Sequence, residues 1–222
     1  MGTKHNVFIT GGTGYMGRSL IIQLLNRGHQ VRALVRRGSE AKLPGGCNPV
    51  VGDALKAESY ASQVAPADTF VQLVGTPSPS PRKAQQFRDV DLASGLAGID
   101  AAKQAHVEHF IYVSVAHPAS IMQAYIEVRT ECEEALRRSG LRATILRPWY
   151  VLGPGHRWPY LLLPVYAVAS LLPGSRETAR RLGLVTLRQM TTALVNAVEN
   201  PVQDVRVLEV PAIRNCRMSM AD

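Results

Sequence analysis

The stretch NVFITGGTGYMG, residues 6–17, decides the fold of this chain. Residues 6–10 form a short apolar run that is typical of a buried strand, and the glycines that follow are typical of a tight turn. After the turn, apolar residues recur at the spacing of an amphipathic helix until Gly28 ends it. The stretch therefore predicts a strand, a glycine turn and a helix in direct succession, the unit with which nucleotide-binding α/β domains begin.

The same alternation continues along the rest of the chain. Further strands are predicted at residues 30–36, 49–53, 69–74, 110–114, 143–146 and 205–210, with helices at 58–64, 85–105, 122–138 and 187–198. Strict alternation of strands and helices implies a parallel sheet that is covered by helices on both faces. We therefore predict an α/β fold of the Rossmann type, a doubly wound parallel sheet of about seven strands.

The length of 222 residues suits one domain with a sizeable core, which we place over residues 1–214, followed by a frayed tail at 215–222. Residues 148–182 depart from the regular alternation and contain an almost wholly apolar run at 160–172. We interpret this segment as a loop and helix that cover the substrate side. Because a bilayer span needs about 20 apolar residues, no membrane span is predicted. Contact with a membrane surface or with a second subunit stays open for this helix.

The composition indicates which partners and which cellular compartment are expected. Lys and Arg number 25 against 17 Asp and Glu, a net charge of +8, but the basic residues are spread over both halves without a nucleic-acid-binding motif. No nucleic-acid partner is therefore predicted. The three cysteines form no C-x-x-C pair and no secretory signal is visible, so a reducing cytoplasm is expected. His106 and His109 span the end of a predicted helix, and no metal site is predicted there.

The glycine turn fits three patterns, which predict different ligands. Gly12-x-Gly14-x-x-Gly17 is the common dinucleotide-binding spacing, and a start at Gly11 gives its variant. In both, glycine lets the backbone N–H groups at the start of the helix approach a pyrophosphate. The third pattern is a phosphate loop for nucleoside triphosphates, which requires lysine where this chain has Arg18. A forked guanidinium replaces the compact ammonium poorly, so the turn favours a dinucleotide.

Residues after the second and third strands indicate which dinucleotide binds. About 20 residues beyond the turn, where an acidic residue would bind the ribose 2′-hydroxyl of NAD, the chain has Arg36 and Arg37. Arginine there suits the 2′-phosphate of NADP, so NADP is predicted, with NAD left open. The alternative is that both arginines are solvated turn residues. Asp53 is predicted to accept a hydrogen bond from the adenine amino group, or else to cap the next segment.

These segments, together with Tyr112-Val113-Ser114 and ATILRP at residues 143–148, resemble the atypical short-chain dehydrogenases/reductases, more narrowly the NmrA-like NAD(P)-binding family. The resemblance runs from about Val7 to Val210 and implies a dinucleotide across the carboxyl edge of a seven-stranded sheet. The residues that it places around the cofactor are Gly11, Thr13, Gly14, Tyr15 and Met16 at the pyrophosphate, Arg36 and Arg37 at the 2′-phosphate, Asp53 and Ala54 at the adenine, Leu73, Val74 and Gly75 at the adenosine ribose, and Pro148 near the nicotinamide.

Catalytic members of this family carry a serine and a Tyr-x-x-x-Lys motif. This chain has Ser114, followed by Tyr125 and Arg129, which lie one helical turn apart on the same helix face. The resemblance implies that Tyr125 donates the proton, Ser114 holds the oxyanion and Arg129 assists Tyr125, although arginine does not release a proton as lysine does. The alternatives are a surface hydroxyl for Tyr125, an ion pair of Arg129 with Glu133, and a polar strand end for Ser114.

Two functions therefore compete. The first is an NADP(H)-dependent oxidoreductase that transfers hydride to or from a small carbonyl or quinone-like substrate, with residues 148–182 shaping the substrate pocket and His156 as a candidate acid. The second is a non-catalytic NADP(H)-binding redox sensor or scaffold protein, which the arginine in place of lysine favours. A homodimer is left open in both cases.

Overall fold

A seven-stranded parallel sheet forms the centre of the molecule in the computed structural model, which describes residues 3–77, 79–117, 122–153 and 183–217. Its strands are β1 (Asn6–Thr10), β2 (Gln30–Val35), β3 (Asn48–Val51), β4 (Thr69–Gln72), β5 (His109–Val113), β6 (Arg142–Arg147) and β9 (Val205–Glu209). They lie in the order β3-β2-β1-β4-β5-β6-β9, and each neighbouring pair runs parallel.

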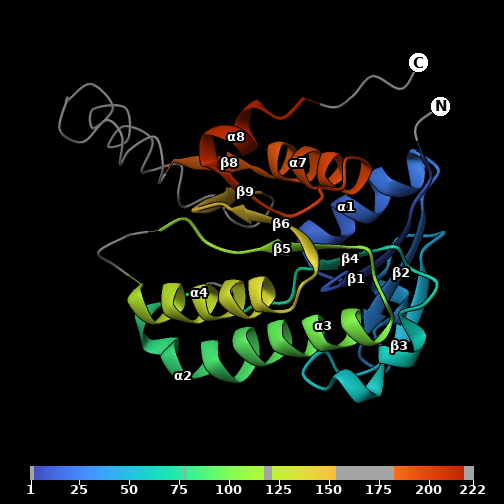
Figure 1. Cartoon of the computed structure of the whole chain (residues 1–222), viewed down its shortest axis with the longest axis horizontal. Helices are drawn as coiled ribbons and strands as arrows, with labels where there is room; N and C mark the ends of the chain where they lie inside the picture. Colours follow the sequence, from blue (N-terminus) through green and yellow to red (C-terminus); the bar gives the residue numbers. More distant parts are fainter. Residues whose placement is uncertain (1–2, 78, 118–121, 154–182, 218–222) are drawn as a thin grey trace.

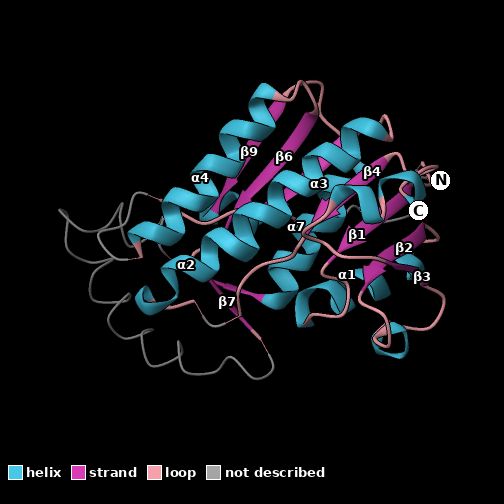
Figure 2. Ribbon diagram, turned by 90° about the horizontal axis from the view of Figure 1, so that it is seen from below, coloured by secondary structure: helices cyan, strands magenta, loops and turns pink. Residues whose placement is uncertain are grey.

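Helices cover both faces of this sheet (Figure 1). One face is covered by α1 (Tyr15–Asn26), α7 (Leu187–Glu199) and α8 (Val210–Asn215), and the other by α3 (Ala93–Gln104) and α4 (Gln123–Arg138). Figure 2 shows α3 and α4 side by side across the strands. The predicted doubly wound parallel sheet is confirmed.

Alternation along the strands divides the core between the two faces. Phe8 joins the cluster on the α3 and α4 side, whereas its neighbours Val7 and Ile9 join the cluster on the α1 and α7 side. Phe8, Phe70 and Phe110 stack across β1, β4 and β5, with ring centroids 5.3 and 5.1 Å apart. These central strands are therefore buried on both sides, as parallel sheets require.

The strand order creates a crevice at the carboxyl end of β1. The chain passes outward from β1 to β2 and β3, and then returns to β4 on the opposite side of β1. At such a reversal the connecting segments diverge, and open α/β sheets bind their ligands between them. The glycine turn, residues 11–14, follows β1 directly at this point.

Two predicted helices differ from the observed ones. Residues 58–64 form two 3₁₀ turns, Ala57–Ser59 and Ala61–Gln63, in which the N–H of Tyr60 bonds the carbonyl of Ala57, three residues back, at 3.0 Å. The long helix predicted at 85–105 is composite, because α2 (Ala84–Gln86) and α3 are joined by a π-helical turn, η5 (Phe87–Leu92), after a 3₁₀ turn at Pro81–Lys83. No local periodicity marks such a turn.

Several short elements were not predicted, including a 3₁₀ turn at Glu40–Lys42. β7 (Tyr150–Leu152) and β8 (Leu184–Thr186) pair in parallel as a separate two-stranded sheet, and α8 begins where we predicted the end of the last strand. Strands of three residues are too short to show alternation, which explains their absence from the prediction. The apolar run at 160–172 and His156 lie outside the described residues. Within the described ranges, no helix is both long and apolar enough to cross a membrane.

His109 is buried at the beginning of β5, at the edge of the sheet opposite the glycine turn. Its Nε2 lies 3.0 Å from Oγ1 of Thr144 on β6. Burial, with smaller contributions from Arg206 and Arg142, lowers the pKa of His109 to about 4. The imidazole is therefore neutral in the folded protein at neutral pH.

Candidate functional site

The glycine turn has the geometry of a diphosphate cradle. Gly11 has a φ of +75°, in the left-handed region that glycine adopts without strain, and its carbonyl accepts a 3.1 Å hydrogen bond from the N–H of Gly14. A Cβ on Gly17 would lie 2.4 Å from the Gly11 carbonyl oxygen and 2.7 Å from Cα of Gly12. Only glycine therefore allows α1 to begin this close to the turn, with its first N–H groups directed at the crevice.

A cleft of about 380 Å³ opens in front of this turn. It is bounded by the glycine turn, the loop after β4, the end of β5, the first turn of α4 and residues 148–151. The predicted site residues that line it are Gly11, Gly14, Tyr15, Met16, Leu73, Gly75, Pro148, Ser114, Tyr125 and Arg129. The structure thus brings the predicted catalytic residues and four of the five predicted pyrophosphate residues into one cleft.

The residues predicted around the adenosine half lie farther along the same edge of the sheet. Arg36 and Arg37 follow β2, and Asp53 and Ala54 follow β3, the two strands next to β1 on that side. None of these four is among the described lining residues of the cleft, and neither are Thr13 and Val74. Asp53 is exposed, and its Oδ1 accepts a 3.0 Å hydrogen bond from the N–H of Leu55, the turn-capping geometry that we weighed for it.

Arg129 is buried beneath the cleft and is paired with Asp91. Its Nη2 lies 2.5 Å from Oδ1 of Asp91, and its Nη1 donates to the carbonyl oxygen of Val113 at 3.0 Å and to the hydroxyl of Tyr112 at 3.3 Å. Burial opposes the charge, but Tyr112, Tyr125 and Asp91 raise the pKa of Arg129 well above its usual value. The alternative pairing with Glu133 is wrong, because α4 turns Arg129 inward to the carboxylate on η5.

Tyr125 is half-buried in the first turn of α4 and lines the cleft. Its ring packs on Phe87 with a centroid distance of 4.9 Å, and the guanidinium carbon of Arg129 lies 5.1 Å from the same ring. Tyr15 faces it from the start of α1, where burial and the nearby Tyr125 raise the pKa of Tyr15. The cleft is therefore lined by the phenols of Tyr15 and Tyr125, and also by Tyr150 of β7.

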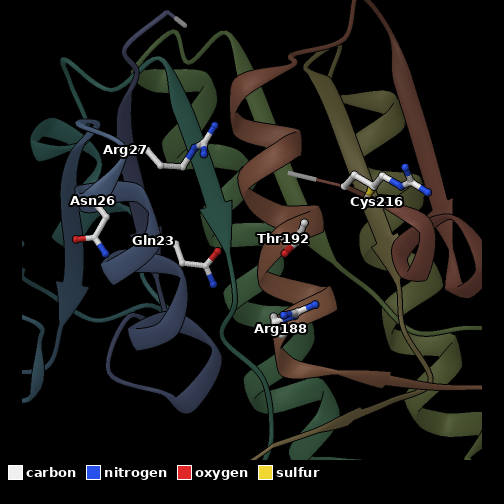
Figure 3. Close-up of a pocket in the computed structure, with 7 residues that line it drawn as sticks. Gln23, Asn26, Arg27, Arg188, Thr192 and Cys216 are labelled. Carbon is white, nitrogen blue, oxygen red and sulfur yellow. The ribbon is translucent and has the colours of Figure 1, made fainter. Parts of the chain in front are cut away.

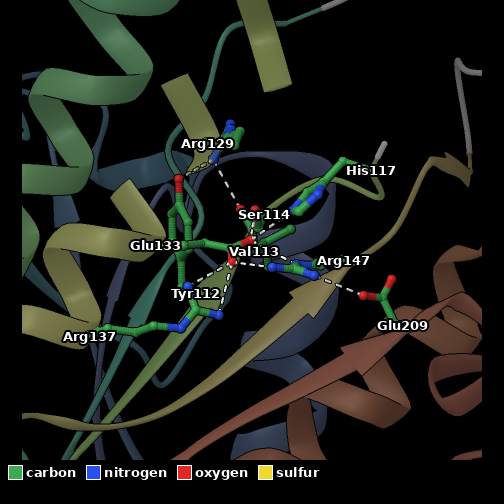
Figure 4. A network of polar contacts seen from close by, with 9 residues as sticks. All are labelled: Tyr112, Val113, Ser114, His117, Arg129, Glu133, Arg137, Arg147 and Glu209. Atoms are coloured by element: carbon green, nitrogen blue, oxygen red, sulfur yellow. Dashed lines mark hydrogen bonds and ion pairs between the residues drawn. The ribbon is translucent and has the colours of Figure 1, made fainter. Parts of the chain in front are cut away.

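Ser114 follows β5 and donates its hydroxyl proton to Oε1 of Glu133 at 2.6 Å. Glu133 is fully buried and also receives Arg147 through two bonds, at 2.9 and 2.5 Å, and Arg137 at 3.2 Å. Arg147 continues to Glu209 at 2.9 Å. Figure 4 shows Glu133 in the middle of this network.

Glu133 is ionised in this setting. Burial alone would raise the pKa of Glu133, but the hydrogen bonds from Arg147 and Ser114 lower it below its usual value. The short bond therefore fixes Ser114 with its proton directed at a carboxylate. The lone pairs of the Ser114 hydroxyl oxygen remain available to a ligand in the cleft.

Sequence reasoning missed Asp91 and misplaced Glu133. Asp91 is 38 residues from Arg129 in the chain, and Glu133 is 14 residues from Arg147, so helical spacing identifies neither pair. One signal was available for Asp91. It stands among small and apolar residues in a segment predicted to be a helix against the core, where an acidic side chain requires a partner.

A second cavity of about 610 Å³ lies between α1 and α7, away from the glycine turn. Figure 3 shows Gln23 of α1, and Arg27 directly after α1, on the side that faces Arg188 and Thr192 of α7. Although this cavity is larger than the cleft, it contains none of the predicted site residues. The described residues contain no group of three or more His, Cys, Asp or Glu side chains that could hold a metal ion.

A model of a family described as NAD(P)H-binding matches residues 11–157, which include the glycine turn, Ser114, Tyr125 and Arg129. The chain belongs to the NAD(P)H-binding family. Within the short-chain dehydrogenases/reductases it is an atypical, NmrA-like member, as the sequence predicted. The tight turn, which requires glycine at positions 11 and 17 because a Cβ there would lie 2.8 and 2.4 Å from backbone atoms, fits the diphosphate of the nicotinamide dinucleotide that this family binds.

Curated relatives of this NAD(P)H-binding protein carry several names. The photosystem II assembly factor Ycf39 of Cyanophora paradoxa is 32% identical over 146 residues, which cover 64% of this chain and 44% of the relative. A 3-beta-hydroxysteroid dehydrogenase of Mycolicibacterium neoaurum is 32% identical over 49% of this chain and 31% of its own length. The ceramide reductase of Caulobacter vibrioides is 26% identical over 88% of this chain and 62% of the relative. The chain spans less than half the length of the first two.

Solved structures share the fold of this NAD(P)H-binding protein. The enzyme WbmH of Bordetella bronchiseptica in complex with NAD+ superposes with a TM-score of 0.69 at 20% identity, covering 92% of this chain and 75% of that one. MoeE5 in complex with UDP-glucose and NAD gives a TM-score of 0.68 at 19% identity, covering 94% and 79%. These similarities establish the Rossmann-like sheet and its flanking helices.

Proposed function

We propose that this chain is an NADP(H)-dependent oxidoreductase that transfers hydride to or from a small carbonyl or quinone-like substrate. The observation that carries the proposal is the position of Tyr125, which lies in the same cleft as the glycine cradle. The names ceramide reductase and 3-beta-hydroxysteroid dehydrogenase among the relatives support a redox role. We place the activity in the cytoplasm, since none of the three cysteines forms a disulfide.

Each residue of the site has a separate role in such a reaction. When bound, the nicotinamide supplies or accepts the hydride. In reduction, the Tyr125 hydroxyl donates a proton to the substrate oxygen, and in oxidation it takes the proton back. Arg129 holds the Tyr125 ring from below and stays protonated, since its charge is matched by Asp91. Ser114, whose proton is held by Glu133, accepts a hydrogen bond from the hydroxyl of an alcohol substrate in oxidation, but it does not hold a carbonyl oxygen or an oxyanion.

The walls of the cleft favour an uncharged substrate. Beyond the glycine turn it is lined by Pro77, Pro79, Val115, Trp149 and Val151. Among the described lining residues the one ionised side chain is Arg129, and Asp91 already neutralises it. A substrate carboxylate or phosphate would lose its hydration there without gaining a counter-charge. A small carbonyl compound or a quinone meets these requirements.

Replacing Tyr125 with phenylalanine tests the catalytic role. Because a positioned general acid contributes about 100-fold or more, we expect NADPH oxidation with a reactive quinone or aldehyde to fall by at least about that factor. The affinity for NADPH should change little, since the ring that packs on Phe87 is retained. Tyr60→Phe is the matched control, because it removes a phenol hydroxyl from the core. Turnover that survives Tyr125→Phe unchanged contradicts the proposed role.

The preference for NADP(H) rests on Arg36. A charge-assisted bond to a 2′-phosphate is worth about 1.5 to 3 kcal/mol, so wild-type protein should bind NADPH about 10- to 100-fold more tightly than NADH. Arg36→Ala should remove most of this difference, while Arg138→Ala, which changes an exposed arginine on α4, should retain it. Fluorescence titration of both nucleotides gives the two constants. Equal affinities in the wild type would show that Arg36 is a solvated turn residue.

A redox sensor or scaffold is the second candidate function, and one observation favours it. The Ser114 proton is committed to Glu133 and the Arg129 charge to Asp91, so both groups already have partners within the protein. Tight NADPH binding without turnover of any carbonyl or quinone in the panel would support this candidate. Turnover that depends on Tyr125 would exclude it.

A further inference from the structure

Asp91 has no part in the functions described so far beyond neutralising Arg129. We infer that Asp91 is a positioning residue which, through Arg129, couples the cofactor-binding loop after β4 to Tyr125. This inference rests on the proposed function, because it assumes that a dinucleotide lies in the cleft. It assigns a role to a side chain that does not itself line the cleft.

The carboxylate of Asp91 is shared between the loop and the arginine. Its Oδ2 accepts hydrogen bonds from the backbone N–H of Thr76 at 3.0 Å and from the Thr76 hydroxyl at 2.6 Å. Its Oδ1 receives Nη2 of Arg129 at 2.5 Å. Asp91 is 1% exposed, so these bonds are little weakened by water. The position of Thr76 is thereby tied to the position of the guanidinium.

Close packing reinforces the same link. A Cβ on Gly75 would lie 2.4 Å from Nη2 of Arg129 and 3.1 Å from Oδ1 of Asp91. The backbone at Gly75 therefore rests directly on the ion pair, and both Gly75 and Thr76 line the cleft. The guanidinium cannot shift toward the cleft without displacing this loop.

The other end of the link is Tyr125. The turn η5 supplies both of its supports, because Phe87 packs on its ring and Asp91 holds the guanidinium that lies 5.1 Å from that ring. A π-helical turn changes the angular offset between residues, and such turns occur frequently at functional sites. Here η5 sets the positions of both the Tyr125 phenol and the loop after β4.

The contacts thus form one continuous path from Thr76 through Asp91 and Arg129 to Tyr125. A movement of the loop on cofactor binding changes the bonds of Asp91, and a rigid ion pair passes the change to the ring. Asparagine cannot replace Asp91 in this path. Its amide offers one oxygen for two sets of donors, so its NH₂ group must face either Arg129 or Thr76, both of which also donate.

Two variants and one control test the coupling at a temperature where circular dichroism shows all of them folded. Thr76→Val removes the hydroxyl bond and leaves the ion pair, and Asp91→Asn disrupts both. We expect each to weaken NADPH binding, Asp91→Asn by about tenfold or more, with Thr76→Val adding nothing in the Asp91→Asn protein. Asp89→Asn, an exposed position on the same turn, should bind NADPH like wild type.

A second readout follows Tyr125 without cofactor or activity. The NMR signal of the Tyr125 ring is assigned as the tyrosine signal that is missing from Tyr125→Phe protein. We expect Thr76→Val to shift this signal when Asp91 is present but not when Asp91 is replaced with asparagine. A structural role alone would leave this signal unmoved by Thr76→Val, and that result overturns the inference even if Asp91→Asn fails to fold. If Thr76→Val and Asp91→Asn bind NADPH as tightly as the wild type, the inference is overturned and the proposed function stands. Wild-type protein that binds no NADPH overturns the proposed function and the inference with it.

Discussion

Replacing Glu133 with glutamine is expected to lower the free energy of unfolding by about 3 to 5 kcal/mol at pH 7, the usual cost of removing one partner of a buried ion pair. Glu133 is fully buried and accepts two hydrogen bonds from Arg147. Arg137 binds its Oε2, and Ser114 donates to its Oε1. The neutral amide leaves the guanidinium groups only partly compensated. For a domain of this size, the melting temperature should fall by about 10 °C.

The effect of Glu133 should depend on pH in a defined direction. The pKa of Glu133 is lowered in the folded protein relative to its usual value of 4.5, so its stabilisation is complete above that pH. It is lost as the pH falls through the folded pKa, and the difference between wild type and Glu133→Gln should close in acid. Urea unfolding at several pH values measures this difference.

Glu134 provides the matched control for this experiment. It is the next residue on α4, its side chain is 57% exposed, and it lies 3.6 Å from Arg138 one turn along the same helix. An exposed pair of this kind contributes at most about 1 kcal/mol, so Glu134→Gln should unfold nearly like wild type. If the two glutamine variants have the same unfolding midpoint, the network around Glu133 does not stabilise the fold.

The second large effect is expected at His109 and appears as acid sensitivity. The pKa of His109 is about 4 in the folded protein against 6.5 when it is unfolded. As the pH falls from 6.5 to about 4, the unfolded chain therefore binds a proton that the folded chain does not, and stability decreases. The full difference is worth about 3 kcal/mol, lost progressively across this range.

His109→Gln should remove that part of the pH dependence, because glutamine does not titrate and still offers an oxygen to Thr144. The comparison is the slope of unfolding free energy against pH between 6.5 and 4 in the two proteins. His106→Asn serves as the control, since His106 is exposed with a φ of 53° that asparagine tolerates. A slope in His109→Gln equal to that of wild type would mean that the imidazole becomes protonated within the fold.

The fold could be predicted because its signals are local. Buried strands appear as short apolar runs, and the glycine turn marks the join between β1 and α1 within a few residues. The strands of the main sheet accordingly lie within two or three residues of the predicted ranges. The helix predictions that were wrong, at the 3₁₀ turns of 57–63 and at the π-helical turn, depend on which carbonyl each N–H selects, and side-chain pattern does not encode that choice.

The candidate site was predictable only where its residues are close in the sequence. Tyr125 and Arg129 are one helical turn apart, and the structure places both at the cleft. Their partners come from other elements of the fold, and the local pairing of Arg129 with Glu133 was wrong because Arg129 pairs with Asp91 on η5 and Glu133 with Arg147 at the end of β6. Charge pairing in a buried site is a property of tertiary packing, and spacing along one helix is a weak guide to it.

The bond from Arg147 to Glu209 joins the last residues of β6 and β9, which are also register partners in the sheet. More than fifty residues separate these two strands along the chain, yet their ends are fastened to each other and to α4. The outer border of the sheet is therefore held by side-chain charge as well as by backbone hydrogen bonds, so the end of β9 cannot separate from β6 without breaking the ion pairs of Arg147.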